Sequence, residues 1–205
     1  MHIDLGPFSP SQDWLVRVST RRRPTPAQYH AFCGLNPDLR IERSAEGELI
    51  VMPPAPSRAG CQNAVLTGQL GMWALQDGTG ISFDSSTGFD LPDGANLSPD
   101  ASWVLKSRVE ALRPDQREEY MDICPDFVVE LRSSSDRLPK LQAKMQEYVA
   151  CGAKLAWLID PLERRVWIYQ PGKEVQCLDE PSTVTAGPLM PGFVLDLGPI
   201  WNPQV

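Results

Sequence analysis

The sequence contains no apolar run approaching the roughly 20 residues that a helix needs to cross a lipid bilayer. Its first residues also lack the apolar segment of a secretory signal peptide, because Asp4, Asp13 and several prolines interrupt them. Both absences argue against membrane and secreted proteins. We therefore expect a cytoplasmic protein that does not bind a membrane.

Cysteine and histidine are also scarce, and neither is arranged as a site. The five cysteines are odd in number and lack the paired spacing of a zinc site. The two histidines, His2 and His30, have no neighbouring Ser, Cys or Asp motif that would indicate nucleophilic catalysis. No phosphate-binding loop is present. These absences argue against a structural zinc site, a disulfide framework, a Ser or Cys hydrolase and a nucleotide-binding protein.

The chain has no excess of positive charge to offer a nucleic acid. Its formal net charge is −7, which counts against binding that depends on Lys and Arg neutralising phosphates. A metal site nevertheless needs carboxylates, and a local basic face can coexist with an acidic whole. The run Arg21-Arg22-Arg23 could contact phosphate, but short charge runs more often form a solvated tail.

The overall composition is that of one globular domain. Hydrophobic residues make up 42% and charged residues 22% of the 205 residues, enough for one α/β domain with a substantial core. Residues 1–23 show no clear periodicity and are predicted to form a loosely ordered N-terminal arm. We expect residues 24–205 to fold as a single domain.

Capping residues and apolar spacing predict three helices. Thr25-Pro26 is a typical helix start. Apolar residues at helical spacing predict further helices over 61–77 and 138–150, with Ser133 to Asp136 supplying the N-cap of the last. The polar stretch 107–120 is predicted to be a surface helix or a lid.

Extended segments separated by turn residues predict the strands of a mixed sheet and peripheral β-hairpins. They are, in order, 40–43, 48–52, 81–83, 88–91, 101–104, 127–131, 155–159, 165–169 and 175–178. We expect an α/β fold in which the helices over 61–77 and 138–150 flank a central mixed sheet.

Glu130 is out of place in its strand. Residues 127–131 otherwise form a compact apolar run, typical of a strand that is covered on both faces. An ionised carboxylate there is costly unless it is paired or binds a metal. Mg²⁺ needs only one or two protein carboxylates besides water and phosphate oxygens. Glu130 and Asp100, which enters an adjacent strand, would suffice.

Lys144 borders the buried stripe of its helix, because it lies about 60° from Leu141 around the helix axis. A cation beside two carboxylates could orient an attacking water and offset charge developing on a phosphate. A purely structural interpretation fits the same residues equally well. In that case, Arg132 or Lys154 would hold Glu130, Asp100 would cap a turn and Lys144 would extend to solvent.

Several short motifs follow one another in a specific order between about Pro24 and Trp201. They are Gly47-Glu48-Leu49, Met52-Pro53, Ser98-Pro99-Asp100-Ala101, Pro125 to Leu131, Ser135-Asp136, Lys144 with Glu147-Tyr148, Gly152, and Trp157 to Pro161. This series resembles the Uma-type restriction endonuclease family of bacteria, which is placed in the PD-(D/E)XK nuclease superfamily. The resemblance implies a restriction-endonuclease-like fold with the site at one edge of the central sheet.

By this resemblance Asp100 and Glu130 are the two metal-binding carboxylates, and Glu48, from the early hairpin, is an accessory acidic group. The superfamily's lysine is expected two residues after Glu130, where this chain has Arg132. Arginine cannot be deprotonated as lysine can. The family offers Lys144 instead as the catalytic cation, with Arg132 as the second candidate.

Relatives also commonly carry a histidine near the start of the helix at 61–77. This chain has none there. Gln62 or Asn63 would have to take its place.

The resemblance favours an endonuclease that depends on Mg²⁺ or Mn²⁺ and hydrolyses phosphodiester bonds, with DNA as the expected substrate. Its predicted catalytic residues are Asp100, Glu130 and Lys144, and the two carboxylates are its predicted metal ligands. A second hypothesis is a degenerate nuclease-fold module that binds nucleic acid or a protein without cleavage, which the acidic balance and Arg132 support. Exposed Trp or Tyr could serve a homodimer, but the core explains most of them equally well.

Overall fold

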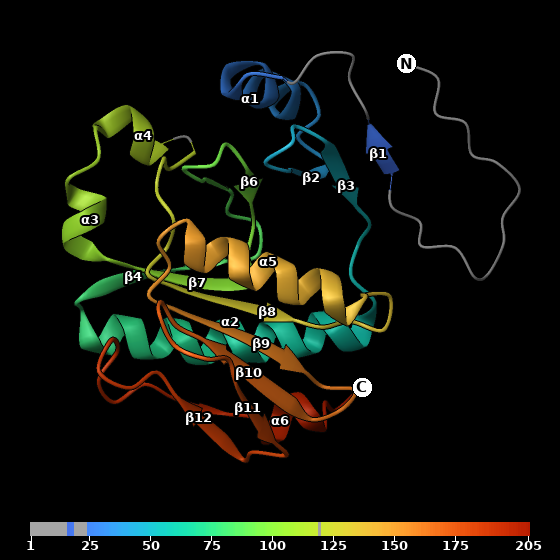
Figure 1. Ribbon diagram of the computed structural model, residues 1–205, viewed down its shortest axis with the longest axis vertical. Helices are drawn as coiled ribbons and strands as arrows, with labels where there is room; N and C mark the ends of the chain where they lie inside the picture. The colour runs from blue at the N-terminus through green and yellow to red at the C-terminus, as the bar shows by residue number, and fades with distance from the viewer. Residues whose placement is uncertain (1–15, 19–23, 119) are drawn as a thin grey trace, which may run out of the picture.

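A six-stranded mixed sheet lies between two long helices, α2 (Ser57–Asp77) and α5 (Leu138–Ala150), in the computed structural model (Figure 1). The structure describes residues 16–18, 24–118 and 120–205. The strand order is β11-β10-β9-β8-β7-β4. These strands are β4 (Gly80–Asp84), β7 (Ala101–Leu105), β8 (Phe127–Leu131), β9 (Leu155–Asp160), β10 (Arg165–Tyr169) and β11 (Gln176–Asp179).

Only one neighbouring pair in this sheet, β8 and β9, is parallel, and α5 forms the crossover that connects its two strands. A parallel pair needs such a crossover, because the chain must return to the same end of the sheet. The other pairs in the sheet are antiparallel. Helix α5 is therefore held directly over β8 and β9, and its side chains can reach those of β8.

A second sheet with the order β1-β3-β2-β6-β5 lies at one end of the first (Figure 1). It consists of β1 (Val16–Val18), β2 (Arg40–Arg43), β3 (Leu49–Met52), β5 (Phe89–Asp90) and β6 (Asn96–Leu97). Helix α1 (Pro26–Leu35) covers it through Tyr29, which packs with Ile41 and Leu49. The remaining elements are α3 (Lys106–Glu110), α4 (Pro114–Glu118), the hairpin of β12 (Thr183–Thr185) and β13 (Val194–Asp196), and α6 (Gly198–Trp201).

The predicted α/β class is confirmed, and most predicted elements coincide with observed ones. Three of the differences concern predicted segments near the site. Helix α2 begins at Ser57 rather than 61. Segment 88–91 contributes β5 to the second sheet. Ser133 and Asp136 form a separate turn, in which the Ser133 amide donates to Asp136 Oδ2 at 2.8 Å, while Arg137 is the N-cap of α5.

The predicted N-terminal arm falls mostly outside the described residues, including its arginine run at 21–23. Residues 16–18 of that arm pair with β3. The single domain over 24–205 stays a prediction. Among the described residues, no helix combines the length and the apolar character needed to span a membrane.

The central sheet separates two hydrophobic layers. Side chains alternate between the faces of a strand, so Phe127, Val129 and Leu131 of β8 pack in the layer of α2. Val128 packs in the opposite layer, with Met145 and Tyr148 of α5. Fully burying one such large side chain stabilises the fold by about 2–3 kcal/mol. The same alternation turns Glu130 toward α5.

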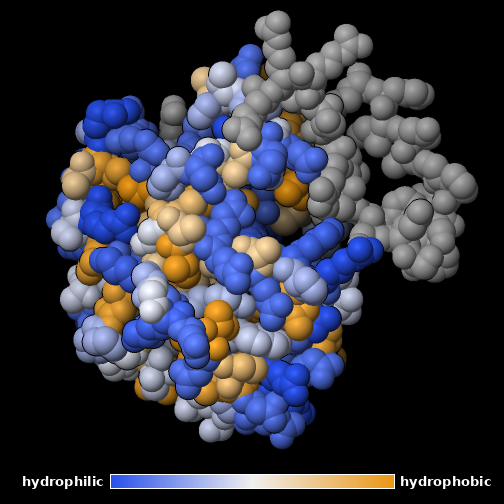
Figure 2. Space-filling view, viewed as in Figure 1, coloured by the Kyte–Doolittle hydropathy of each residue, from blue (hydrophilic) through white to orange (hydrophobic). Residues whose placement is uncertain are grey.

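The outer face shows no large apolar patch in the view that looks onto α5. Hydrophobic side chains there lie in small groups among hydrophilic ones (Figure 2).

Candidate active site

Two of the predicted site residues lie side by side, Asp100 directly before β7 and Glu130 within β8. Ala101 of β7 is paired with Val129 of β8, and these strands are antiparallel, so Asp100 comes opposite Glu130. The Leu131 amide donates a hydrogen bond to Asp100 Oδ2 at 2.8 Å. The sheet register therefore brings the two carboxylates together from positions 30 residues apart in the sequence.

Helix α5 supplies the cation of the cluster. The Lys144 ammonium Nζ lies 2.9 Å from Glu130 Oε1 and 3.0 Å from Glu42 Oε1. Tyr148, one turn further along the helix, donates its hydroxyl to Glu130 Oε1 at 3.0 Å. Residues four apart on a helix share a face, so the strand carboxylate meets both side chains. The side chain of Lys144 is 18% exposed, which leaves it open to one side of the cluster.

Glu42 is a site residue that the sequence interpretation missed. It lies on β2 and is 5% exposed, like Glu130. Its Oε1 also accepts a hydrogen bond from the Ser98 amide at 2.9 Å. Glu48, the predicted accessory acid, is half-buried beside β3 in the same hairpin. It is Glu42 that contacts Lys144.

One of the two residues considered for the missing histidine reaches the cluster. Asn63 on α2 donates its side-chain Nδ2 to Asp100 Oδ1 at 3.1 Å. Its Oδ1 is buried and accepts no hydrogen bond from any residue that the structure describes. Gln62 instead donates to the Ile200 carbonyl at 2.7 Å, a contact that ties α2 to α6. Asn63 is therefore the residue of this pair at the site.

Arg132 contacts a carboxylate outside the cluster. Its Nη1 lies 2.6 Å from Asp160 Oδ2, and the Asp160 side chain is fully buried. The contact joins the ends of β8 and β9, which are parallel neighbours. Arg132 thus serves as the counterion of a buried carboxylate, and its accessory part at the site stays a prediction.

The cluster holds three carboxylates, those of Glu42, Asp100 and Glu130, and the one ammonium of Lys144. Burial raises the pKa of Glu130 to about 7. The nearby Asp100 and Glu42 carboxylates raise it too, whereas Lys144 lowers it. Burial also raises the pKa of Asp100, although the Leu131 amide and the Asn63 side chain oppose it. Burial alone would lower the pKa of Lys144, but the Glu130 and Glu42 carboxylates outweigh it and raise that pKa. The lysine is therefore a cation at neutral pH.

The sequence matches the Uma2 family model, which is described as "Putative restriction endonuclease", over residues 26–198. This match covers most of the chain. The chain therefore belongs to the Uma2 family.

A solved structure shows the same fold as this Uma2 chain. It is titled "Crystal structure of a putative nuclease belonging to DUF820 from Anabaena variabilis ATCC 29413". The two chains superpose with a TM-score of 0.66 and 20% identity, over 78% of this chain and 89% of that one. No curated protein matches the sequence. The restriction-endonuclease-like fold implied by the motif series is thereby confirmed, and so is the family.

Restriction-endonuclease-like proteins generally depend on a divalent metal, and the Uma2 cluster fits such an ion by its chemistry. The described residues contain no ready group of three His, Cys, Asp or Glu side chains around one point. Mg²⁺ needs fewer protein ligands than that, because water and phosphate oxygens complete its shell. Tyr148 and Lys144 both contact Oε1 of Glu130, and the buried Asn63 Oδ1 has no hydrogen-bond partner within the described part of the chain. Oxygen donors and a deficit of positive charge thus occur together.

A second carboxyl pair borders the site and predicts a pH effect on stability. Burial and the adjacent Asp93 carboxyl raise the pKa of Glu147 from 4.5 to about 7. The folded state therefore holds this proton more tightly than the unfolded state. The stabilisation is fully present below pH 4.5 and is lost as the pH rises through 7.

We expect Glu147→Gln to raise the unfolding midpoint at pH 8 by about 2–4 °C, which corresponds to roughly 1 kcal/mol after solvent screening. The gain should shrink as the pH falls toward 5. Thermal unfolding between pH 5 and pH 8 measures this gain. The proteins compared are wild type, Glu147→Gln and the exposed control Glu174→Gln. A gain that is the same at every pH would contradict the assignment.

Proposed function

We propose that this protein is a metal-dependent endonuclease that hydrolyses phosphodiester bonds in DNA. One observation carries the proposal: the Lys144 ammonium lies between the buried carboxylates of Glu42 and Glu130, and Asp100 stands opposite Glu130 on the next strand. Membership of the Uma2 family supports a nuclease activity. Cleavage of a phosphodiester needs an activated water and compensation of the charge that develops on phosphorus, and this group of side chains can supply both.

Asp100 and Glu130 are the proposed ligands of Mg²⁺ or Mn²⁺. A bound divalent ion would lower the pKa of a water molecule and polarise the phosphate. The protein's part is to hold both carboxylates in position for the ion. The Leu131 amide and Asn63 hold Asp100, while Tyr148 and Lys144 hold Glu130.

Lys144 acts as a fixed cation rather than as a base, because the neighbouring carboxylates raise its pKa. Its ammonium can donate to the attacking water or to a phosphate oxygen and so offset developing negative charge. Glu42 keeps the lysine in place through the 3.0 Å contact. The described residues of each chain form one such cluster, so simultaneous cleavage of two strands would require a homodimer.

A nuclease-fold module that binds nucleic acid or protein without cutting is the second candidate. The contact between Arg132 and Asp160 favours it, because the usual lysine of the PD-(D/E)XK strand is replaced by a residue engaged elsewhere. In the endonuclease Lys144 would replace the usual strand lysine in catalysis, whereas in the binding module no residue would replace it.

Cleavage of supercoiled plasmid and of short single- and double-stranded oligonucleotides tests the proposal. Purified protein should nick or cut in Mg²⁺ or Mn²⁺ and should do nothing in EDTA. If plasmid and oligonucleotides stay intact in both metals while the protein still binds them, the binding module is the correct function.

Arg132→Lys offers a separate check on the cation. Because Arg132 lies against Asp160, we expect this variant to keep cleavage within about threefold of wild type. Arg132→Ala should instead lower stability by roughly 2–3 kcal/mol, because it leaves Asp160 buried without its cation. A loss of cleavage in Arg132→Lys of a hundredfold or more, with normal thermal stability, would assign catalysis to Arg132.

A further inference from the structure

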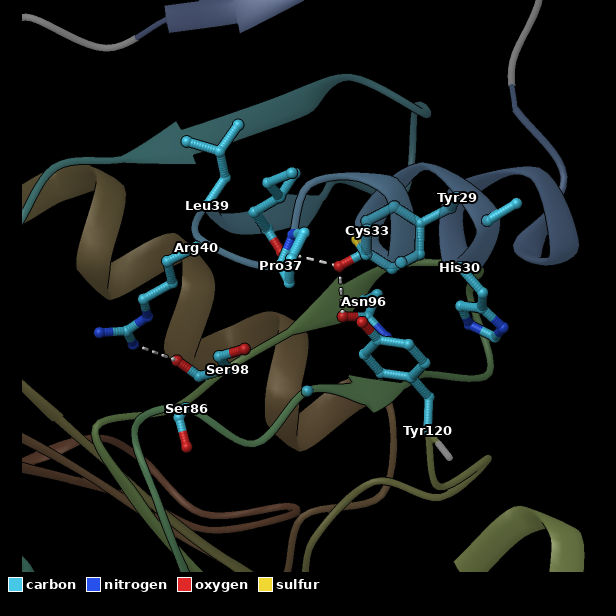
Figure 3. A pocket seen from close by; sticks show the side chains of 14 residues that line it. Tyr29, His30, Cys33, Pro37, Leu39, Arg40, Ser86, Asn96, Ser98 and Tyr120 are labelled. Carbon is cyan, nitrogen blue, oxygen red and sulfur yellow. Dashed lines mark hydrogen bonds between the residues drawn. The ribbon is translucent and has the colours of Figure 1, made fainter. Parts of the chain in front are cut away.

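A cavity of about 610 Å³ opens directly beside the carboxylate cluster. It lies between α1, the start of β2 and Tyr120, and its lining includes Arg40 and Ser98 (Figure 3). The backbone amide of Ser98 donates a hydrogen bond to Glu42, so Ser98 lies between the cavity and the cluster. Packed interiors leave few voids larger than a water molecule, and pockets for organic ligands measure about 300–1,000 Å³. This space is therefore of the size of a ligand site.

Aromatic rings form one side of the cavity. The ring of Tyr120 stacks on His30 with centroids 4.4 Å apart and an angle of 19° between the planes. Tyr29 supports them from α1, with its hydroxyl 2.7 Å from the Ile41 carbonyl and 2.8 Å from Asn96 Oδ1. Tyr29 is 1% exposed, whereas Tyr120 is only half-buried and its ring reaches into the cavity (Figure 3).

Gly88 shows how closely the chain is fitted around this ring. A Cβ at position 88 would lie 2.8 Å from Asn96 Oδ1 and 3.1 Å from a carbon of the Tyr120 ring. A larger residue would push the ring or the amide aside. The position of Tyr120 is thus fixed on two sides, as expected of a platform for a planar ligand.

The two ends of the cavity differ in charge. Asp90 lies behind the aromatic end, 2.8 Å from His30 Nε2. Arg40 stands at the opposite end, next to Ser98, and its buried Nε has no hydrogen-bond partner among the described residues. It is also near enough to Asp100 to act electrostatically on that carboxyl. An anion would therefore be attracted to the Arg40 end, where a guanidinium suits a phosphate.

We propose that this cavity binds one unpaired nucleobase of the substrate strand, stacked on Tyr120, with its phosphate directed past Arg40 to the carboxylate cluster. A base within a duplex cannot enter such a pocket without leaving its stack, so the preferred substrate carries an unpaired nucleotide. This inference rests on the proposed function and names its substrate class. DNA and RNA both carry nucleobases, and the experiment below compares binding of the two nucleic acids.

The test is a set of binding titrations in EDTA, where cleavage does not interfere. The probes are end-labelled 20-base-pair duplexes of DNA and of RNA, each fully paired, with one bulged adenine, or with one bulged abasic residue. We expect the bulged adenine to bind about tenfold more tightly than either other form, in DNA, RNA or both, because base stacking on an aromatic ring has this order of effect. Equal affinity for all three forms with both nucleic acids would overturn the inference.

Four variants locate the effect. Tyr120→Ala should lose the preference, and Tyr120→Phe should keep it because the ring remains. Gly34→Leu should also lose it, since a side chain at this exposed lining position meets nothing within 4 Å and would occupy the cavity without disturbing the fold. Leu75→Ala, on the exposed face of α2, is the control. An unchanged preference in Tyr120→Ala and Gly34→Leu would place base recognition elsewhere.

Failure of this inference is distinguishable from failure of the proposed function. Metal-dependent plasmid cutting without any preference for the bulge would leave the nuclease standing and remove the base pocket. A preference for the bulge without cutting in any metal would keep the pocket and support the binding module.

Discussion

Glu130→Gln abolishes metal-dependent cleavage on this account, with a loss of at least about 10³-fold, or about 4 kcal/mol of transition-state stabilisation. In the wild-type protein Tyr148 and Lys144 contact Glu130 Oε1 at 3.0 and 2.9 Å. The amide of the variant keeps the shape of the carboxyl group and can still accept hydrogen bonds from both. It removes the charge that would hold the metal. The unfolding midpoint should therefore stay within a few degrees of wild type, and initial rates of plasmid cleavage in Mg²⁺ measure the loss.

Asp100→Asn should behave in the same way, because Asp100 is the second proposed ligand. Glu110→Gln, an exposed acid on α3, is the matched control and should cleave at the wild-type rate. If Glu130→Gln cleaves within tenfold of wild type, the carboxylate is not a metal ligand and the cluster is structural.

Lys144→Met combines a loss of activity with a loss of stability. Glu42 and Glu130 are each 5% exposed and share this ammonium, so its removal leaves two buried carboxylates without their cation. Breaking a buried ion pair from one side costs about 3–5 kcal/mol, which lowers the unfolding midpoint of a chain of this length by roughly 10 °C. Cleavage should fall by about 10²–10³-fold.

The double variant Lys144→Met with Glu130→Gln separates charge from packing. It should unfold several degrees higher than Lys144→Met alone, because one uncompensated charge is gone. Lys140→Met, an exposed position on the same helix, is the control and should match wild type in both assays. A Lys144→Met protein with wild-type stability would show that the contacts of this ammonium do not matter to the fold.

The positions of two candidate site residues could be predicted from the sequence, because each departs from the pattern around it. Glu130 interrupts an apolar strand, and the helix that follows carries Lys144 at the border of its buried stripe. The structure places both where these patterns indicate. Asp100 was expected to enter a strand adjacent to that of Glu130, and the sheet register pairs β7 with β8.

Glu42 could not be predicted in this way, because its burial depends on how the second sheet packs against α5. Its strand, Arg40–Arg43, has three charged residues out of four and looks solvent-facing from the sequence. Glu48 was predicted to be the accessory acid instead, because it belongs to a family motif. Arg132 was a candidate cation for a similar reason. Its partner Asp160 lies 28 residues away on β9, so the sequence does not reveal that the two side chains are in contact.

Binding of Mn²⁺ tests the central claim most directly, because it does not depend on the choice of nucleic acid. Electron paramagnetic resonance can count the bound ion in wild type, Asp100→Asn, Glu130→Gln and the control Glu110→Gln. The account predicts one Mn²⁺ per chain in wild type and in the control, and affinity at least about tenfold weaker in both site variants. Equal Mn²⁺ binding by all four proteins, or none by wild type, would contradict the assignment of Asp100 and Glu130 as a metal centre.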